Sequence, residues 1–111
     1  MTNAWLTLEP HRTIVGYTFG GGHYASPVMI GLTPADVVRM LPRGSEAIGV
    51  ASYGVMTDES GRRHSVRLAL AVNEGSASGQ ITYLDTGHSE ELPGPPDGEL
   101  IDVIRKQLTY F

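Results

Sequence analysis

The sequence contains no cysteine, and this absence removes several classes of site at once. A disulfide framework, an iron–sulfur cluster held by thiolates and a thiol nucleophile are all excluded. Without covalent cross-links the fold must rest on its apolar core. Such a chain suits a reducing compartment, and we expect a cytoplasmic protein.

Basic residues are also scarce. Lys106 is the only lysine, and seven arginines accompany it, against twelve acidic residues, so the formal net charge is −4. Sequence-independent binding to nucleic acid needs clustered lysine and arginine to displace counterions. The one local concentration is Arg62 and Arg63 with Arg67. We therefore predict no nucleic-acid partner.

Long apolar runs are missing as well. No stretch approaches the roughly 18 residues of a membrane-spanning helix, so no membrane association is predicted. The segment Met1–Glu9 has no basic flank followed by an apolar run, and we expect no secretory signal there.

The sequence also lacks recognisable motifs for catalysis or metal binding. The histidines at positions 11, 23, 64 and 88 form neither His-x-His nor His-Glu-x-x-His, so no metal and no cofactor is predicted. The stretch Gly75–Gly79 resembles a nucleophile elbow in its glycines only, because its central residue is Ala77 rather than serine. The sequence thus favours a non-enzymatic protein, with a small enzyme left open as an alternative.

What is present predicts a single domain over residues 1–111. Thr33, followed by Pro34 and by Asp36 three residues after the cap, predicts a helix of about two turns that Pro42 ends. An apolar stripe after Asp97 predicts a closing helix. Strands are expected at Ala4–Leu8, Thr13–Phe19, Val28–Ile30, Ile48–Met56, Ser65–Val72 and Gln80–Leu84, with a loop at Asn73–Gly79.

These elements predict the fold class. The order β-β-β-α-β-β-β-α with short connections is typical of an α+β domain. We expect a mainly antiparallel sheet of five to six strands and two helices, with the C-terminal helix packed on the sheet.

The acidic residues are distributed unevenly. Six of them lie between Asp85 and Asp102, a stretch without lysine or arginine. An acidic surface of this kind steers and docks a basic partner, whereas solvated loop and helix acids are the plainer interpretation. The predicted partner-binding residues are Asp85, His88, Glu90, Glu91 and Asp97.

Residues 80–111 also resemble a known group of proteins. The run Gln80-Ile81-Thr82-Tyr83, then Gly87-His88, then a proline-containing acidic link at 91–96 and Glu99–Arg105, resembles the tail of bacterial immunity proteins that neutralise deaminase-type polymorphic toxins. The resemblance implies a small cytosolic α+β inhibitor that binds its toxin and catalyses nothing. That group usually continues into a Pro and Trp segment, whereas this chain ends at Phe111.

Two alternatives remain at this stage. The first is a small-molecule-binding protein or small enzyme with a site at Gly20–Ser26, where Gly21, Gly22, His23 and Tyr24 let a ligand approach the backbone. The second is a homo-oligomeric structural or phage component that pairs through an edge strand.

Overall fold

One antiparallel sheet of seven strands dominates the computed structural model, which describes residues 8–73, 76–92 and 98–109. In chain order the strands are β1 Leu8–Phe19, β2 Gly22–Ala25, β3 Met29–Ile30, β4 Ala47–Thr57, β5 Arg63–Asn73, β6 Ser76–Tyr83 and β7 Ser89–Glu91. Across the sheet they follow the order β2-β1-β4-β5-β6-β7, and β3 pairs with β1 on the same edge as β2.

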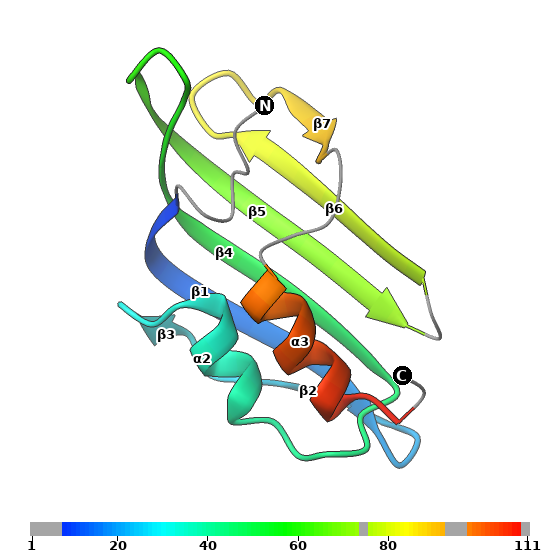
Figure 1. The fold of residues 1–111 in the computed structure, drawn as a ribbon. Coiled ribbons are helices and arrows are strands. Elements are labelled where there is room, and N and C mark those ends of the chain that lie inside the picture. The colour runs from blue at the N-terminus through cyan, green and yellow to red at the C-terminus, as the bar shows by residue number, and fades with distance from the viewer. Residues whose placement is uncertain (1–7, 74–75, 93–97, 110–111) are drawn as a thin grey trace.

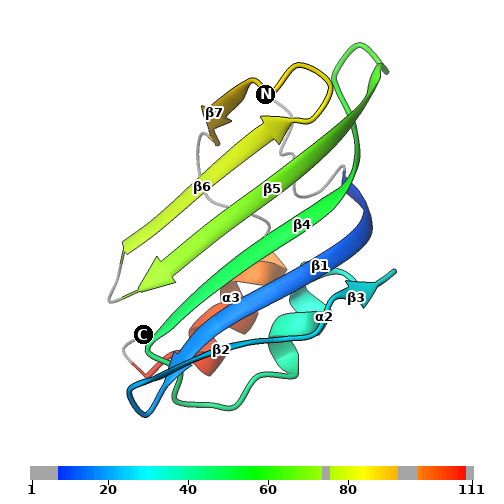
Figure 2. The same ribbon diagram turned by 180° about the vertical axis from the view of Figure 1, so that it is seen from behind.

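The two helices of the described residues lie on one face of this sheet (Figure 1). Helix α2 spans Pro34–Arg39 and begins as its sequence predicts, since the Thr33 hydroxyl accepts the backbone N–H of Asp36 at 3.2 Å. Helix α3 spans Gly98–Gln107 and lies beside α2. Seen from behind, the sheet has no described element over its other face (Figure 2).

The core fills the space between the helices and the sheet. Burial alternates residue by residue along β4 and β5, because successive side chains point to opposite faces of a strand. Val50 and Leu70 of these strands pack with Val38 of α2 and Ile104 of α3 in the main cluster. The residues that alternate with the buried ones along β4 and β5 point to the side of the sheet without helices. We call this side the open face.

A second, smaller cluster extends the core away from the helices. It contains Met56, Val66, Leu68 and Ile81, and the ring of Tyr83 packs against it. The described sheet therefore has one face that carries both apolar clusters and one open face.

The predicted fold class is confirmed: the structure is α+β, with a mainly antiparallel sheet and the C-terminal helix packed on it. The strand predicted at Ala4–Leu8 lies outside the described residues, apart from Leu8. The expectation that Leu8 and Thr13–Phe19 belong to separate strands is wrong, because β1 continues from Leu8 through Pro10 to Phe19, with a register shift between Pro10 and Arg12. Such an irregularity removes the need for a proline N–H in the ladder.

The predicted loop at Asn73–Gly79 is also wrong in its second half. Ser76–Gly79 belongs to β6 and pairs with Leu70–Asn73 of β5. Small polar residues have weak strand preference, and pairing with a strong neighbouring strand overrides that preference here. The short strands β2 and β7 were not predicted for the same reason.

No helix in the described ranges is long and apolar enough to cross a membrane.

Candidate functional site

Four of the five predicted partner-binding residues lie together in the hairpin that joins β6 to β7. The hairpin closes through hydrogen bonds between Tyr83 and His88 and between Gly87 and Tyr83, both 2.8 Å long. Gly87 has a positive φ of 75°, a conformation that glycine adopts without strain. The Asp85 carboxylate accepts the backbone N–H of Thr86 at 3.0 Å and so shapes the turn. Asp97 lies outside the described residues.

The two adjacent glutamates of β7 point to opposite faces of the sheet. Glu90 is paired with Ile81, whose side chain belongs to the core face, and Glu91 is paired with Gln80 on the open face. Both glutamates are exposed. The hairpin thus presents carboxylates at its turn and on both faces, and we call Asp85, Glu90 and Glu91 the acidic corner.

His88 connects the acidic corner to the sheet. Its ring stacks on Tyr83 at a centroid distance of 6.2 Å, and its Nε2 lies 3.4 Å from the Glu90 carboxylate. The ring of His64 meets the same tyrosine edge-on at 5.4 Å. Burial raises the pKa of Tyr83, and the charges of Glu90 and Asp58 raise it further. The phenol is therefore kept neutral rather than activated as a nucleophile.

The aspartate beside His64 organises the turn between β4 and β5. Asp58 accepts hydrogen bonds from the Ser60 hydroxyl at 2.6 Å, from His64 Nε2 at 2.8 Å and from the Arg62 N–H at 2.9 Å. These donors, the Ser60 hydroxyl first, hold the pKa of Asp58 well below its ordinary value. The sequence gives no signal for this contact, because Asp58-Glu59-Ser60-Gly61 indicates only a turn.

Successive contacts connect five titratable residues at one end of the sheet, in the order Asp58, His64, Tyr83, His88 and Glu90. This row lies at the surface of the protein. His88 and Glu90 are more than half exposed, and no group of three His, Asp or Glu in the described ranges is placed to hold a metal ion. These contacts therefore lie at the surface of the protein, where water and salt screen the charges.

The helical half of the acidic run lies elsewhere. Glu99 and Asp102 are on α3 and line a cleft of about 500 Å³ with Arg39, Arg43 and Lys106. Arg39 forms ion pairs with Asp36 and with Glu99. These acids of α3 therefore face basic side chains, and they do not extend the acidic corner.

The alternative site at Gly20–Ser26 is a hairpin between β1 and β2. Gly20 and Gly21 form its turn with φ values of 58° and 83°. His23 is paired with Thr18, and Tyr24 is paired with Tyr17, so the two side chains point to opposite faces. Tyr24 stacks on Tyr17 at 5.4 Å.

The hollow beside these residues has a volume of about 270 Å³ and is open rather than enclosed. His23 and Tyr24 are both exposed. Both residues line the hollow, and because it is open, this hairpin offers a ligand little burial.

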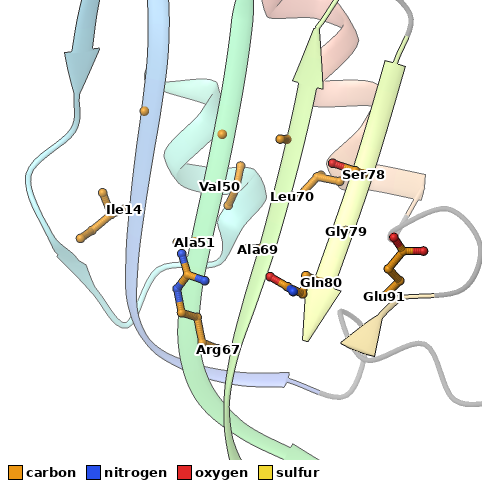
Figure 3. Close-up of a pocket in the computed structure, with 13 residues that line it drawn as sticks. Ile14, Val50, Ala51, Arg67, Ala69, Leu70, Ser78, Gly79, Gln80 and Glu91 are labelled. Carbon is orange, nitrogen blue, oxygen red and sulfur yellow. The ribbon is translucent and has the colours of Figure 1, made fainter. Parts of the chain in front are cut away.

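A larger groove crosses the open face, with a volume of about 490 Å³ (Figure 3). Its floor follows the register of the sheet, in which Gly16 lies opposite Gly49, Gly49 opposite Ala71, and Ala71 opposite Ser78. The absence of large side chains in this row hollows the sheet surface. Arg67, Gln80 and Glu91 stand along the groove on three neighbouring strands.

Comparison with protein-family models, with curated proteins and with solved structures finds no match.

Proposed function

We propose that this chain is a non-enzymatic protein-binding domain whose acidic corner docks a basic surface of its partner. One observation carries the proposal: Asp85, Glu90 and Glu91 are exposed on a single edge hairpin, and residues 76–92 contain no lysine or arginine. Carboxylates in a segment without lysine or arginine raise the local negative potential and attract a positively charged surface.

The geometry also suits recognition of a protein surface. The hairpin turn is fixed by its own hydrogen bonds, and His88 is stacked on Tyr83, so the carboxylates are displayed from an ordered support. Because the hairpin is already ordered, it loses little conformational entropy when a partner binds. Charges at the exposed rim act mainly on the association rate.

The resemblance of residues 80–111 to bacterial immunity proteins supplies the class of partner. On that basis we propose an immunity-like inhibitor that acts in the bacterial cytoplasm and covers a basic surface of a toxin. The resemblance spans β6, β7 and α3, and the acidic corner lies within it.

A binding experiment with charge-reversed variants tests this proposal. The chain is co-expressed with the proteins encoded beside its gene, and the affinity for any captured partner is then measured with both proteins purified. Replacing Asp85, Glu90 and Glu91 by lysine is expected to weaken binding by about tenfold or more, since like charges at an interface are costly. Glu46→Lys is the matched control. Glu46 is an exposed acid that directly precedes β4, outside the β6–β7 hairpin.

The toxin version has its own readout. Co-expression of the wild-type chain is expected to restore growth of cells that express the captured toxin, and the triple variant is expected to lose this protection. Unchanged affinity of the triple variant for every captured partner contradicts the acidic corner. Binding without rescue of growth contradicts the immunity role alone.

The edge of β6 favours a second candidate, a homo-oligomer. Strand β7 pairs only with Gln80–Thr82, so Ser76–Ser78 has no strand partner on its outer side among the described residues. These residues carry neither charge nor proline to block addition of a strand. A concentration-dependent mass in light scattering that Ala77→Lys abolishes is expected for this candidate, and a constant monomer mass contradicts it.

A further inference from the structure

Two arginines flank one aromatic ring on the open face. Arg12 of β1 and Arg67 of β5 lie opposite Tyr53 of β4 in the strand register, one on each side. Their guanidinium carbons are 4.9 Å and 5.9 Å from the centroid of the Tyr53 ring. The ring thus holds two cations in place on three adjacent strands.

Neither of these cations is neutralised within the described part of the chain. Arg12 and Arg67 have no carboxylate partner there, whereas Arg39 pairs with Asp36 and Glu99, and Arg63 pairs with Glu9 at 2.8 Å. Two guanidinium groups held beside one ring repel each other, and an anion bound next to them reduces that repulsion. Guanidinium groups favour carboxylates because two parallel N–H bonds match the two oxygens.

The groove described above reaches Arg67 of this pair. Arg67 lines it, its floor is made of small residues such as Gly49 and Ala69, and Glu91 of the acidic corner stands at the far side (Figure 3). The order of charges across the open face is therefore positive at β1 and β5 and negative at β7. A ligand that matches this order carries an acidic group and a basic group separated by a slim segment.

We propose that the open face binds a polypeptide segment of the partner, with an acidic side chain held by Arg12 and Arg67 and a basic side chain at Glu91. The main chain of the segment lies over Ala69 and Gln80, which share the row of Glu91 in the strand register and line the groove with Arg67. This inference rests on the proposed function, because Glu91 is shared with the acidic corner. It adds that the partner contributes an acidic contact as well as a basic one.

A polypeptide matches this face better than single-stranded nucleic acid. Nucleic-acid platforms stack bases on free aromatic rings. Arginines from β1 and β5 already lie over the ring of Tyr53, and Glu91 in the groove beside Arg67 repels phosphates.

Titration of the full chain with synthetic peptides, followed by nuclear magnetic resonance of its amide and arginine side-chain groups, tests the inference. The main probe is a blocked peptide with one glutamate and one lysine separated by three small residues. A peptide with glutamine in place of the glutamate and a single-stranded oligonucleotide are the other probes. We expect the main probe to shift signals of Tyr53, Arg67 and Ala69, and the glutamine peptide to bind about tenfold more weakly.

Arginine variants sharpen the test. The double variant Arg12→Gln/Arg67→Gln is expected to bind the main probe about tenfold more weakly than the wild type. The affinity of Arg67→Lys is expected to lie between those of the wild type and the double variant, because lysine keeps the charge without the bidentate geometry. Arg43→Gln is the matched control at an exposed arginine of the helical side. Circular dichroism of each variant shows whether the fold is retained.

Three results overturn the inference: equal affinity of the double variant and the wild type for the main probe, tighter binding of the oligonucleotide than of the peptide, or a dimer of the chain that the arginine changes abolish. The captured partner separates this inference from the proposed function. Loss of partner binding in Asp85→Lys/Glu90→Lys, with full binding in Arg12→Gln/Arg67→Gln, leaves the acidic corner standing and refutes the open-face site. The reverse pattern refutes the acidic corner alone.

Discussion

Leu68 and Ala69 are neighbours in the chain and lie on opposite faces of β5, so we predict opposite responses to a change of side-chain size. Leu68 has 0% of its surface exposed and packs with Met56, Val66 and Ile81. Leu68→Ala removes its buried methyl groups and leaves a cavity, which costs about 2–5 kcal/mol of unfolding free energy. Leu68→Val, which removes less volume, serves as a milder variant with an expected loss of about 1 kcal/mol.

Ala69 points into the open groove, where no described element lies above it. Ala69→Leu therefore places its new carbons in unoccupied space, and we expect the unfolding free energy to change by no more than about 0.5 kcal/mol. Urea unfolding followed by far-ultraviolet circular dichroism gives both values, with the m-value as a check that the unfolded states match. A loss of 2 kcal/mol or more for Ala69→Leu would refute the open face, because only a covered surface resists a larger side chain.

Three further predictions concern single contacts. The hydroxyls of Thr13 and Ser52 meet at 3.0 Å with no surface exposed, so Thr13→Val is expected to cost about 1–3 kcal/mol in urea unfolding, and Thr13→Val/Ser52→Ala to recover part of that loss because no hydroxyl is left unpaired. Gly21 has a φ of 83° and open space around it, so Gly21→Ala is expected to cost about 1 kcal/mol through backbone strain alone, and an unchanged melting temperature contradicts that reason. The pKa of Asp58 is lower in the folded chain than its ordinary value of 3.8, so its stabilisation is complete above that pH and declines as the pH falls below it. Melting temperatures between pH 7 and pH 2 are expected to converge for wild type and Asp58→Asn at the acidic end, and a constant difference contradicts this.

The sequence alone predicts those parts of the fold in which local chemistry and tertiary packing agree. The alternation of Val66, Leu68 and Leu70 predicts β5 and its buried face, and Thr33 with Asp36 predicts the start of α2. In each case the residue preference and the packing favour the same conformation.

The parts that were missed depend on pairing with distant residues. Ser76–Gly79 forms a strand because β5 provides a partner, although its own composition favours a loop. Glu90 and Glu91 point to opposite faces because side chains alternate along a strand. The sequence did not predict this, because β7 contains no apolar residues that would indicate a strand. The contact of Arg12 and Arg67 with Tyr53 depends on the register of three strands, and sequence spacing contains no signal for it.

The most direct measurement of the proposed function is the rate of association with the captured partner as a function of salt. Attraction between exposed charges is screened over about 8 Å at physiological ionic strength, so an association that the acidic corner steers slows as salt is added. We predict a steep decline for the wild type and a shallow one for the variant with lysine at Asp85, Glu90 and Glu91. Identical rates and identical salt dependence for the two proteins would contradict a role of the acidic corner in binding.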